Sequence, residues 1–285
     1  MTQLITQDTQ RSVKQWLEAQ RTAGFDDLAL YRALRDSGWD HLTACDWVGL
    51  KPAQVQTGSL PVAATQARAV PWPENAGQQA WLEAGDRRVQ ALAVMHEPPI
   101  IVLGQLLDDQ ECEGLMDAAR PRLQRSLTVS LQSGGDEENA DRTSQGMFFQ
   151  RGETELIARI EQRLARLLNW PVENGEGLQI LRYGPGTEYK PHYDYFDPAA
   201  PGTASILKRG GQRVATVVMY LNDPQAGGAT VFPDVQFECL PVRGNAVFFN
   251  YSQPDPSSRS LHAGAPVLRG EKWIATKWLR EGRFD

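Results

Sequence analysis

Three residues in the second half of the 285-residue chain could bind a metal ion together. His192 and Asp194 are separated by one residue, so on a β-strand both side chains project from one face and can contact one ion. The chain has only four histidines. His41 lies in the helical N-terminal region and His96 at the end of an early strand, so His262 is the other histidine in the late β-rich region. Two imidazoles and one carboxylate form a ligand set that leaves open positions on non-haem Fe(II). The pattern predicts a metal site, although an H-x-D pair alone is more often an ordinary loop or core histidine.

A lysine follows the third candidate ligand by ten residues. Lys272 lies an even number of residues from Ile274, Thr276 and Trp278, so on a strand these four side chains share one face. Most lysines are solvated surface cations. A lysine directed into a barrel among bulky neighbours would instead require an anion, which indicates an anionic ligand near the metal.

The elements that must position these residues differ along the chain. Residues 8–50 have helical spacing, with glycines at the expected helix ends, and predict a small three-helix domain over residues 1–51. Residues 52–77 are rich in proline and alanine and have no sustained period, which predicts a linker that lies along the next domain through Trp72.

The remaining residues, 78–285, read as one larger domain. A strand over 87–107 and a helix over 108–123 come first, followed by a strongly amphipathic helix over 152–170. After Pro171 the pattern changes to short strands between turns. Helices followed by strands predict an α+β domain with an antiparallel β-sandwich or barrel.

Composition limits the partners and the compartment. A net charge of -6 and a pI near 5.4 argue against nucleic acid. We expect no contact with membranes and a cytoplasmic location, because the sequence shows neither a membrane-spanning apolar run nor a signal-peptide pattern. The three cysteines (Cys45, Cys112 and Cys239) are far apart and indicate buried thiols rather than disulfides or a zinc site.

Several ordered motifs carry a resemblance to a known family. They are "RTSQGMFF", "EGLQILRYGPGTEYKPHYDYFDP", "GGQRVATVVMYLNDPQAGGATVFP", "VRGNAVFFNY" and "LHAGAPVLRGEKWIATKWL". Over Val89 to Glu281 the chain resembles the prolyl 4-hydroxylases among the Fe(II)- and 2-oxoglutarate-dependent dioxygenases, of the bacterial type with an extra N-terminal helical module. The resemblance implies a double-stranded β-helix, or jelly-roll, core with supporting helices.

The resemblance also implies roles for individual residues. His192, Asp194 and His262 match the iron ligands, and Lys272 matches the lysine that binds the distal carboxylate of 2-oxoglutarate. These four are the expected catalytic residues. Tyr183 and Thr230 match hydroxyl groups at the same carboxylate, although a core tyrosine and a strand threonine are the simpler alternatives. The positions that match the peptide groove are Arg142, Thr143, Ser144, Tyr189, Arg213 and Trp278. Arg213 could equally be a structural ion-pair partner.

The implied reaction is the hydroxylation of a prolyl residue in a peptide or protein. Fe(II) would be the cofactor, 2-oxoglutarate and O2 the cosubstrates, succinate and CO2 the products, and ascorbate the reductant. Tyr189, Tyr195 and Trp278 are expected to line an aromatic groove for an extended, proline-containing peptide. A collagen substrate is not expected, because the collagen-modifying members are secretory.

Other interpretations stay open. The same chemistry could act on another residue or on a free small molecule. Alternatively, the protein could be a sensor or scaffold with little turnover that recruits a protein partner through its N-terminal helices. The polar stretches near 132–145 and 197–212 could close over a substrate or could be plain connections. Ala265 departs from the family, where many members have a cysteine, but that cysteine is not an iron ligand.

Overall fold

The computed structural model describes residues 13–14, 16–18, 20–21, 26–36, 39, 41–51, 69–125, 127–129, 136–138 and 144–285. The chain divides into two compact units, Met1–Gln66 and Ala67–Asp285. Among the described residues, no helix has both the length and the apolar character needed to cross a membrane.

The first unit contains two described helices, α2 (Asp27–Asp36) and α3 (His41–Val48). The Asp26 carboxylate accepts a hydrogen bond of 2.7 Å from the Ala29 N–H, as a helix N-cap does. Gly49 follows α3 with φ of +81°, which glycine adopts without a steric penalty. The first predicted helix lies mostly outside the described residues, so the three-helix domain stays a prediction. The buried core of this unit comprises Leu17, Leu30, Leu34, Ala44 and Val48.

The second unit is built around a nine-stranded antiparallel sheet, the major sheet, with the order β1-β2-β3-β14-β10-β17-β8-β7-β4. Its strands are β1 (Trp81–Glu83), β2 (Arg88–His96), β3 (Pro99–Gly104), β4 (Gln124–Arg125), β7 (Gln145–Phe149), β8 (Leu178–Tyr183), β10 (Arg213–Tyr220), β14 (Ala246–Asn250) and β17 (Lys272–Arg280).

A four-stranded antiparallel sheet, the minor sheet, has the order β13-β12-β15-β9. Its strands are β9 (Tyr189–His192), β12 (Thr230–Phe232), β13 (Phe237–Cys239) and β15 (His262–Gly264). Two short pairs complete the β-structure: β5 (Leu127–Val129) with β6 (Asp136–Glu138), and β11 (Ala226–Gly227) with β16 (Val267–Arg269).

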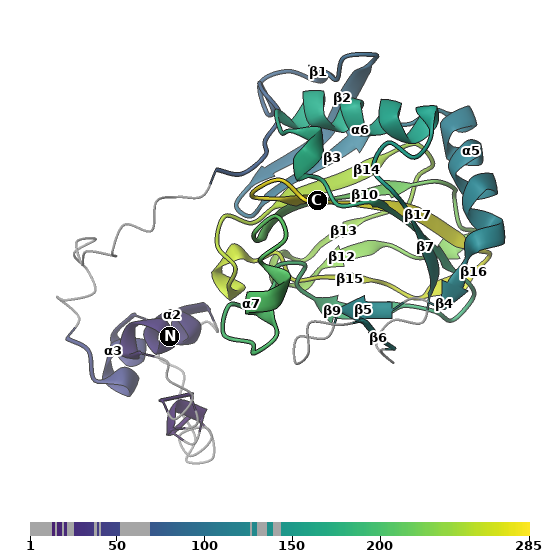
Figure 1. The fold of residues 1–285 in the computed structure, drawn as a ribbon. Helices are drawn as coiled ribbons and strands as arrows, with labels where there is room; N and C mark the ends of the chain where they lie inside the picture. The colour runs from purple at the N-terminus through teal and green to yellow at the C-terminus, as the bar shows by residue number, and fades with distance from the viewer. Residues whose placement is uncertain are drawn as a thin grey trace. The chain divides into compact units, whose positions relative to one another are not determined.

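Helices α5 and α6 cover the major sheet on the side away from the minor sheet (Figure 1). The α-helices of this unit are α5 (Asp109–Ala119), α6 (Glu155–Leu168) and α7 (Thr203–Ile206), and the 3-10 helices are η1 (Arg120–Arg122), η2 (Val172–Asn174), η3 (Pro233–Val235) and η4 (Pro256–Ser258). This arrangement is the α+β fold with a jelly-roll core that the sequence predicted. The polar stretch 197–212 was expected to be a loop, but the structure places the short helix α7 within it.

Strand β17 contributes side chains to the helix-covered core on one face of the major sheet and to a pocket on the other face. All nine of its residues are buried, and successive side chains point to opposite faces of the sheet. Trp273, Ala275 and Leu279 pack into the core between the major sheet and the helices. Lys272, Ile274, Thr276 and Trp278 line a pocket on the opposite face, as their even spacing predicted.

The amphipathic helix forms where its apolar periodicity predicted it. Thr154 caps the start of α6 by accepting a hydrogen bond from Ile157 N–H, and Asn169 ends the helix in the left-handed conformation. Ile160, Leu164 and other apolar residues on the inner face are buried in the core against the sheet. Helix α6 therefore packs on one face of the major sheet, and the pocket lies on the opposite face.

One predicted element is wrong in its extent. The stretch 87–107 was expected to be a single strand, but it forms the antiparallel pair β2 and β3, with His96 opposite Pro99. The chain reverses at Glu97 and Pro98. Proline has no N–H and restricts the residue before it, so the "EPP" segment interrupts the strand.

The segment around Trp72 packs against the core of the second unit, as the sequence predicted. The Trp72 N–H donates to Leu168 O at 3.2 Å, and the indole ring lies 6.0 Å from the Phe248 ring. The Asn250 side chain donates to Pro71 O at 2.9 Å. The chain near Trp72 therefore belongs to the structured unit.

A buried ion pair joins α6 to β17. Lys277 Nζ lies 2.5 Å from Glu161 Oε1, and both side chains are almost fully buried, with exposures of 2% and 1%. Glu161 Oε2 also accepts the Gly152 N–H at 2.8 Å. Two charges removed from water stabilise a fold only while they remain paired.

We predict that Lys277→Met destabilises the protein by about 3–5 kcal/mol, because it leaves the Glu161 carboxylate buried without its cation. Urea denaturation followed by circular dichroism measures this change. The double variant Lys277→Met with Glu161→Leu should recover part of the loss, since both charges are then absent. Equal destabilisation in the single and double variants would contradict a dominant role for the unpaired charge.

Candidate functional site

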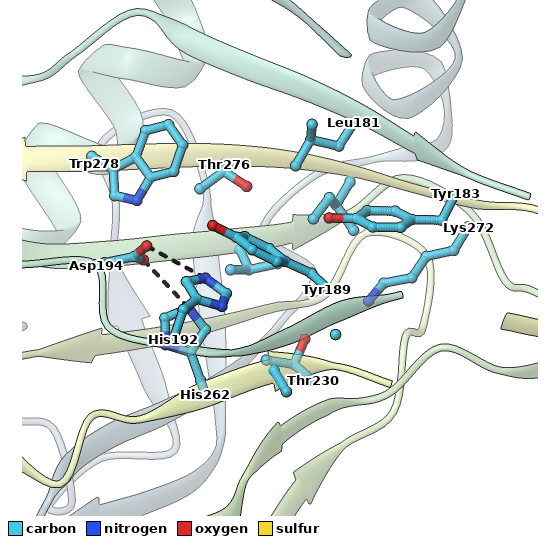
Figure 2. Close-up of a pocket in the computed structure, with 14 residues that line it drawn as sticks. Leu181, Tyr183, Tyr189, His192, Asp194, Thr230, His262, Lys272, Thr276 and Trp278 are labelled. Carbon is cyan, nitrogen blue, oxygen red and sulfur yellow. Dashed lines mark ion pairs between the residues drawn. The ribbon is translucent and has the colours of Figure 1, made fainter. Parts of the chain in front are cut away.

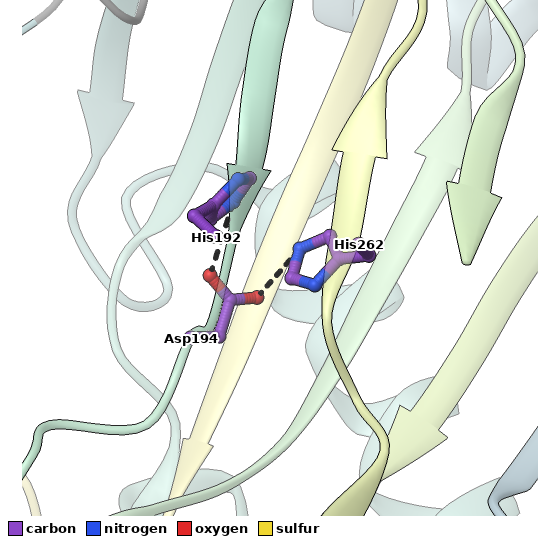
Figure 3. A group of neighbouring side chains, drawn as sticks. All are labelled: His192, Asp194 and His262. Atoms are coloured by element: carbon purple, nitrogen blue, oxygen red, sulfur yellow. Dashed lines mark ion pairs between the residues drawn. The ribbon is translucent and has the colours of Figure 1, made fainter. Parts of the chain in front are cut away.

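The three candidate metal ligands converge at one edge of the minor sheet (Figure 3). His192 ends β9 and His262 begins β15, and the two residues are direct partners in the strand pair. Asp194 Oδ1 lies 3.7 Å from His192 Nε2, and Asp194 Oδ2 lies 3.5 Å from His262 Nε2. One ligand atom from each residue falls within 4.8 Å of the other two.

The strand explains only part of this geometry. Because β9 ends at His192, Asp194 lies beyond the strand, and side-chain alternation alone does not place it. The Thr216 hydroxyl, from β10 of the major sheet, donates to Asp194 Oδ2 at 2.7 Å. Arg213 donates to the Asp194 backbone carbonyl at 3.4 Å. Contacts to the opposite sheet therefore complete the position of the carboxylate.

Hydrogen bonds to backbone carbonyls also orient the two imidazole rings. His192 Nδ1 lies 2.8 Å from Lys190 O, and His262 Nδ1 lies 2.9 Å from Ser260 O. A carbonyl oxygen can only accept, so each Nδ1 carries a proton, and each Nε2 is the atom that faces Asp194. Such backbone contacts are usual around metal-bound histidines.

The electrostatics suit a cation at this place. Burial alone would raise the pKa of Asp194, but the interactions with His262, His192 and Arg213, together with the Thr216 hydrogen bond, lower its pKa to about 2. The group is therefore a carboxylate at neutral pH. Two imidazole nitrogens and one carboxylate, all buried or half-buried, are a donor set that fits Fe(II).

A pocket extends from this centre along the concave face of the major sheet (Figure 2). Tyr183 on β8, Lys272 on β17 and Thr230 on β12 lie at the end away from Trp278. Tyr183 and Lys272 are direct partners in the pairing of β8 with β17. The structure thus brings the residues expected to bind 2-oxoglutarate into the same pocket as the ligand triad.

Lys272 is the unusual group in this pocket. Its side chain is 3% exposed, and burial lowers its pKa to about 8. No carboxylate among the described residues forms an ion pair with it; the Nζ atom lies instead 5.6 Å and 5.8 Å from the ring centroids of Tyr183 and Tyr220. A buried ammonium without a protein counter-charge favours an anionic ligand.

The predicted groove residues have different surroundings. The Tyr189 ring stacks on the His192 ring at 3.6 Å, and Trp278 lines the pocket. Tyr195 does not line it; this residue is buried and lies 4.8 Å from the ring of Tyr193. Ser144, directly before β7, is buried, whereas residues 142–143 lie outside the described residues.

Arg213 has a structural role that is visible in its contacts. It donates through Nε and Nη2 to the two carboxylate oxygens of Glu176 at 2.6 and 2.9 Å. Its guanidinium also lies 4.0 Å from the centroid of the Trp278 ring. The alternative of an ion-pair partner is therefore realised, and a contact with substrate stays a prediction.

Sequence reasoning missed three residues around the site. Glu176 holds Arg213, Thr216 holds Asp194, and the Tyr251 hydroxyl lies 3.0 Å from the Thr216 hydroxyl. A signal existed for Thr216, which is a polar residue within an otherwise apolar strand. No local signal indicated Tyr251, because its role depends on a contact 35 residues away in the sequence.

A jelly roll that holds two histidines and an aspartate beside a buried, unpaired lysine defines the class of Fe(II)- and 2-oxoglutarate-dependent oxygenases. Comparison with known proteins agrees: residues 178–280 match the 2OG-Fe(II) oxygenase superfamily. Prolyl 4-hydroxylase 1 of Arabidopsis thaliana is 44% identical over 212 residues, which are 68% of this chain and 72% of the plant protein. Within the class, the chain belongs to the prolyl 4-hydroxylase family.

Two further relatives are similar over a comparable length. Prolyl 4-hydroxylase 5 of Arabidopsis thaliana is 38% identical over 221 residues, 70% of this chain and 74% of that protein. The viral collagen prolyl hydroxylase of Paramecium Bursaria Chlorella virus-1, solved as a 2OG complex, has a TM-score of 0.50 and 32% identity, and the match covers 64% of this chain and 95% of the viral one. These relatives are plant and viral proteins, so they do not support the expectation of a bacterial-type prolyl 4-hydroxylase.

The pKa of Lys272 leads to a prediction for the binding of 2-oxoglutarate. Below pH 8 the buried lysine is charged and can pair with the dicarboxylate, whereas above it the free protein loses this charge. The apparent KM for 2-oxoglutarate should therefore rise up to about tenfold per pH unit above pH 8. Steady-state succinate assays from about pH 6.5 to about pH 9.5 measure this dependence.

Lys272→Arg is the matched variant, because a guanidinium stays charged over this range and should flatten the pH profile. Lys272→Ala should have a high KM at every pH. A flat wild-type profile that coincides with that of Lys272→Arg would contradict the role of the lysine charge.

Proposed function

We propose that this protein hydroxylates prolyl residues at C4 in peptides or proteins. The substrate C–H bond becomes C–OH, while 2-oxoglutarate and O2 become succinate and CO2, with one oxygen atom entering each of substrate and succinate. The observation that carries the proposal is the pairing, in one pocket, of the His192, Asp194 and His262 triad with the buried cation of Lys272. Family membership supplies the prolyl specificity.

The triad residues would hold Fe(II), and Tyr183, Thr230 and Lys272 would hold the distal carboxylate of 2-oxoglutarate. Bound iron supplies the redox chemistry that couples oxidation of 2-oxoglutarate to hydroxylation of the substrate. The Tyr220 hydroxyl donates to the Thr230 hydroxyl at 2.8 Å, so the Thr230 proton is free to point to the carboxylate. The viral relative was solved as a 2OG complex, which supports 2-oxoglutarate as the cosubstrate.

The pocket walls limit access of water to the reacting groups. Leu181, Val218 and Ile274 contribute apolar surface between the lysine end and the ligand triad. All three side chains are buried. A preformed pocket with apolar walls orients the cosubstrate and strengthens its contact with the Lys272 ammonium.

Trp278 is suited to bind the peptide. Its side chain is 7% exposed, and its indole N–H has no hydrogen-bond acceptor among the described residues. Figure 2 shows the indole at the end of the pocket away from Lys272, near Asp194. The Arg213 guanidinium, stacked on the indole and fixed by Glu176, holds the ring in place. A peptide carbonyl would satisfy the unpaired donor.

We also propose that residues 1–51 form a small helical domain. A linker over 52–77, whose part around Trp72 packs on the second unit, joins it to the dioxygenase domain over 78–285. The α2 and α3 helices share a buried core, and an exposed tryptophan, Trp16, is 37% accessible. Exposed aromatic residues are frequent in protein contacts, which favours a protein partner for this unit. The cytoplasmic location and the use of ascorbate as reductant stay predictions.

We predict that full-length protein with Fe(II) and ascorbate converts 2-oxoglutarate to succinate, and that His192→Ala reduces this conversion to background. Loss of one of three ligands removes the metal from the site. Quantification of succinate by mass spectrometry measures the reaction. His96→Ala is the matched control, because His96 lies on β2 outside the pocket and should retain wild-type turnover. Unchanged succinate formation in His192→Ala would contradict the metal assignment.

A second prediction concerns the peptide. Proline-rich peptides should gain one oxygen atom per modified proline, and the same peptides with alanine in place of proline should gain none. Trp278→Phe should raise the KM for peptide about 5- to 30-fold, since one hydrogen bond is worth about 1–2 kcal/mol. Its succinate formation without peptide should stay near wild type. Hydroxylation of free proline but not of peptides would instead favour a small-molecule substrate.

A further inference from the structure

The carboxylate of Asp194 is connected to the interior of the major sheet by two hydroxyl groups. Thr216 Oγ1 donates to Asp194 Oδ2 at 2.7 Å, and the Tyr251 hydroxyl lies 3.0 Å from Thr216 Oγ1. Thr216 has a single hydroxyl proton, which goes to the carboxylate because a carboxylate can only accept. The proton in the second contact must therefore come from Tyr251, so the chain runs from Tyr251 to Thr216 to Asp194.

This hydrogen-bond chain is buried away from solvent. The exposures of Asp194, Thr216 and Tyr251 are 6%, 0% and 2%. Thr216 is in the central strand β10, and Tyr251 directly follows β14, its neighbour in the sheet. The Tyr251 ring also packs at 6.2 Å from the Phe249 ring. Water therefore has little access to replace either hydroxyl, and both donors are held by the sheet backbone.

Asp194 needs such support more than the two histidines do. His192 and His262 lie on paired strands, and each imidazole has a backbone carbonyl as its partner. Asp194 follows the end of β9, where no ladder holds it. The Thr216 hydroxyl is the side-chain donor that reaches its carboxylate across the space between the two sheets.

We propose that Tyr251 and Thr216 are positioning residues for the metal: they orient the Asp194 carboxylate so that Oδ2 receives a hydrogen bond and Oδ1 is presented to Fe(II). Groups that hydrogen-bond metal ligands commonly contribute about 10- to 100-fold to metal affinity. This inference rests on the iron site and is independent of the identity of the peptide. Metal binding can therefore test it even if no prolyl substrate is found.

The chain offers a matched control for the test. Tyr220, on the same strand as Thr216, donates to Thr230 at 2.8 Å in a second buried tyrosine–threonine pair. That pair lies at the Lys272 end of the pocket and does not contact Asp194. Tyr220→Phe removes a comparable buried hydroxyl without affecting the Asp194 carboxylate.

The experiment is a titration of the full-length, metal-free protein with Mn(II) in the absence of 2-oxoglutarate, with free Mn(II) measured by electron paramagnetic resonance. Thr216→Val, which keeps the shape and removes the hydroxyl, should weaken Mn(II) binding about 10- to 100-fold. Tyr251→Phe should weaken it about 3- to 10-fold. Thr216→Ser and Tyr220→Phe should bind Mn(II) as the wild type does.

A double variant separates positioning from general damage to the core. If Tyr251 acts through Thr216, Tyr251→Phe should cause no further loss of Mn(II) affinity in the Thr216→Val background. Wild-type affinity in folded Thr216→Val, or a full additive loss in the double variant, would overturn the proposal. If Thr216→Val does not fold, Tyr251→Phe decides: wild-type Mn(II) affinity in that variant would also overturn it.

Discussion

Burial of charge is the constraint on which this structure depends. Charges removed from water must be paired, and around the jelly roll they are: Arg213 and Arg280 share Glu176, and Lys277 contacts Glu161. Lys272, on the same strand as Lys277, faces the pocket and has no carboxylate partner among the described residues. This contrast distinguishes a functional charge from structural ones, because Lys272 is left for a ligand to neutralise.

The site is assembled from two sheets that contribute different groups. The minor sheet supplies the histidines, which its strand pairing brings together, and the major sheet supplies the lysine and the hydroxyl donor to Asp194. Packing of the aromatic core between the sheets therefore sets the distance between the metal ligands and the cosubstrate cation. Residues such as Phe232 and Phe249, whose rings lie 5.1 Å apart across this core, support catalysis through packing alone.

The sequence predicted those features that depend on local spacing. Strand alternation placed Lys272, Thr276 and Trp278 on one face, and the ordered motifs indicated the jelly roll and the iron ligands. It did not predict the β2–β3 hairpin, where a proline segment interrupts an apolar run. Contacts such as Tyr251 with Thr216 or Glu176 with Arg213 could not be predicted either, since they arise from strand order and register, which single-sequence patterns do not specify.

The burial of every residue in β17 also limits which sequence changes this strand can tolerate during evolution. Alternate residues of this strand belong to two separate interiors, one of them catalytic. A substitution changes either the helix-covered core or the pocket. Inserting or deleting one residue would instead turn every following side chain of the strand to the opposite face of the sheet. The strand can therefore accept amino-acid substitutions but not insertions or deletions. Insertions that diversify such an enzyme are confined to the loops beyond the ends of the strand.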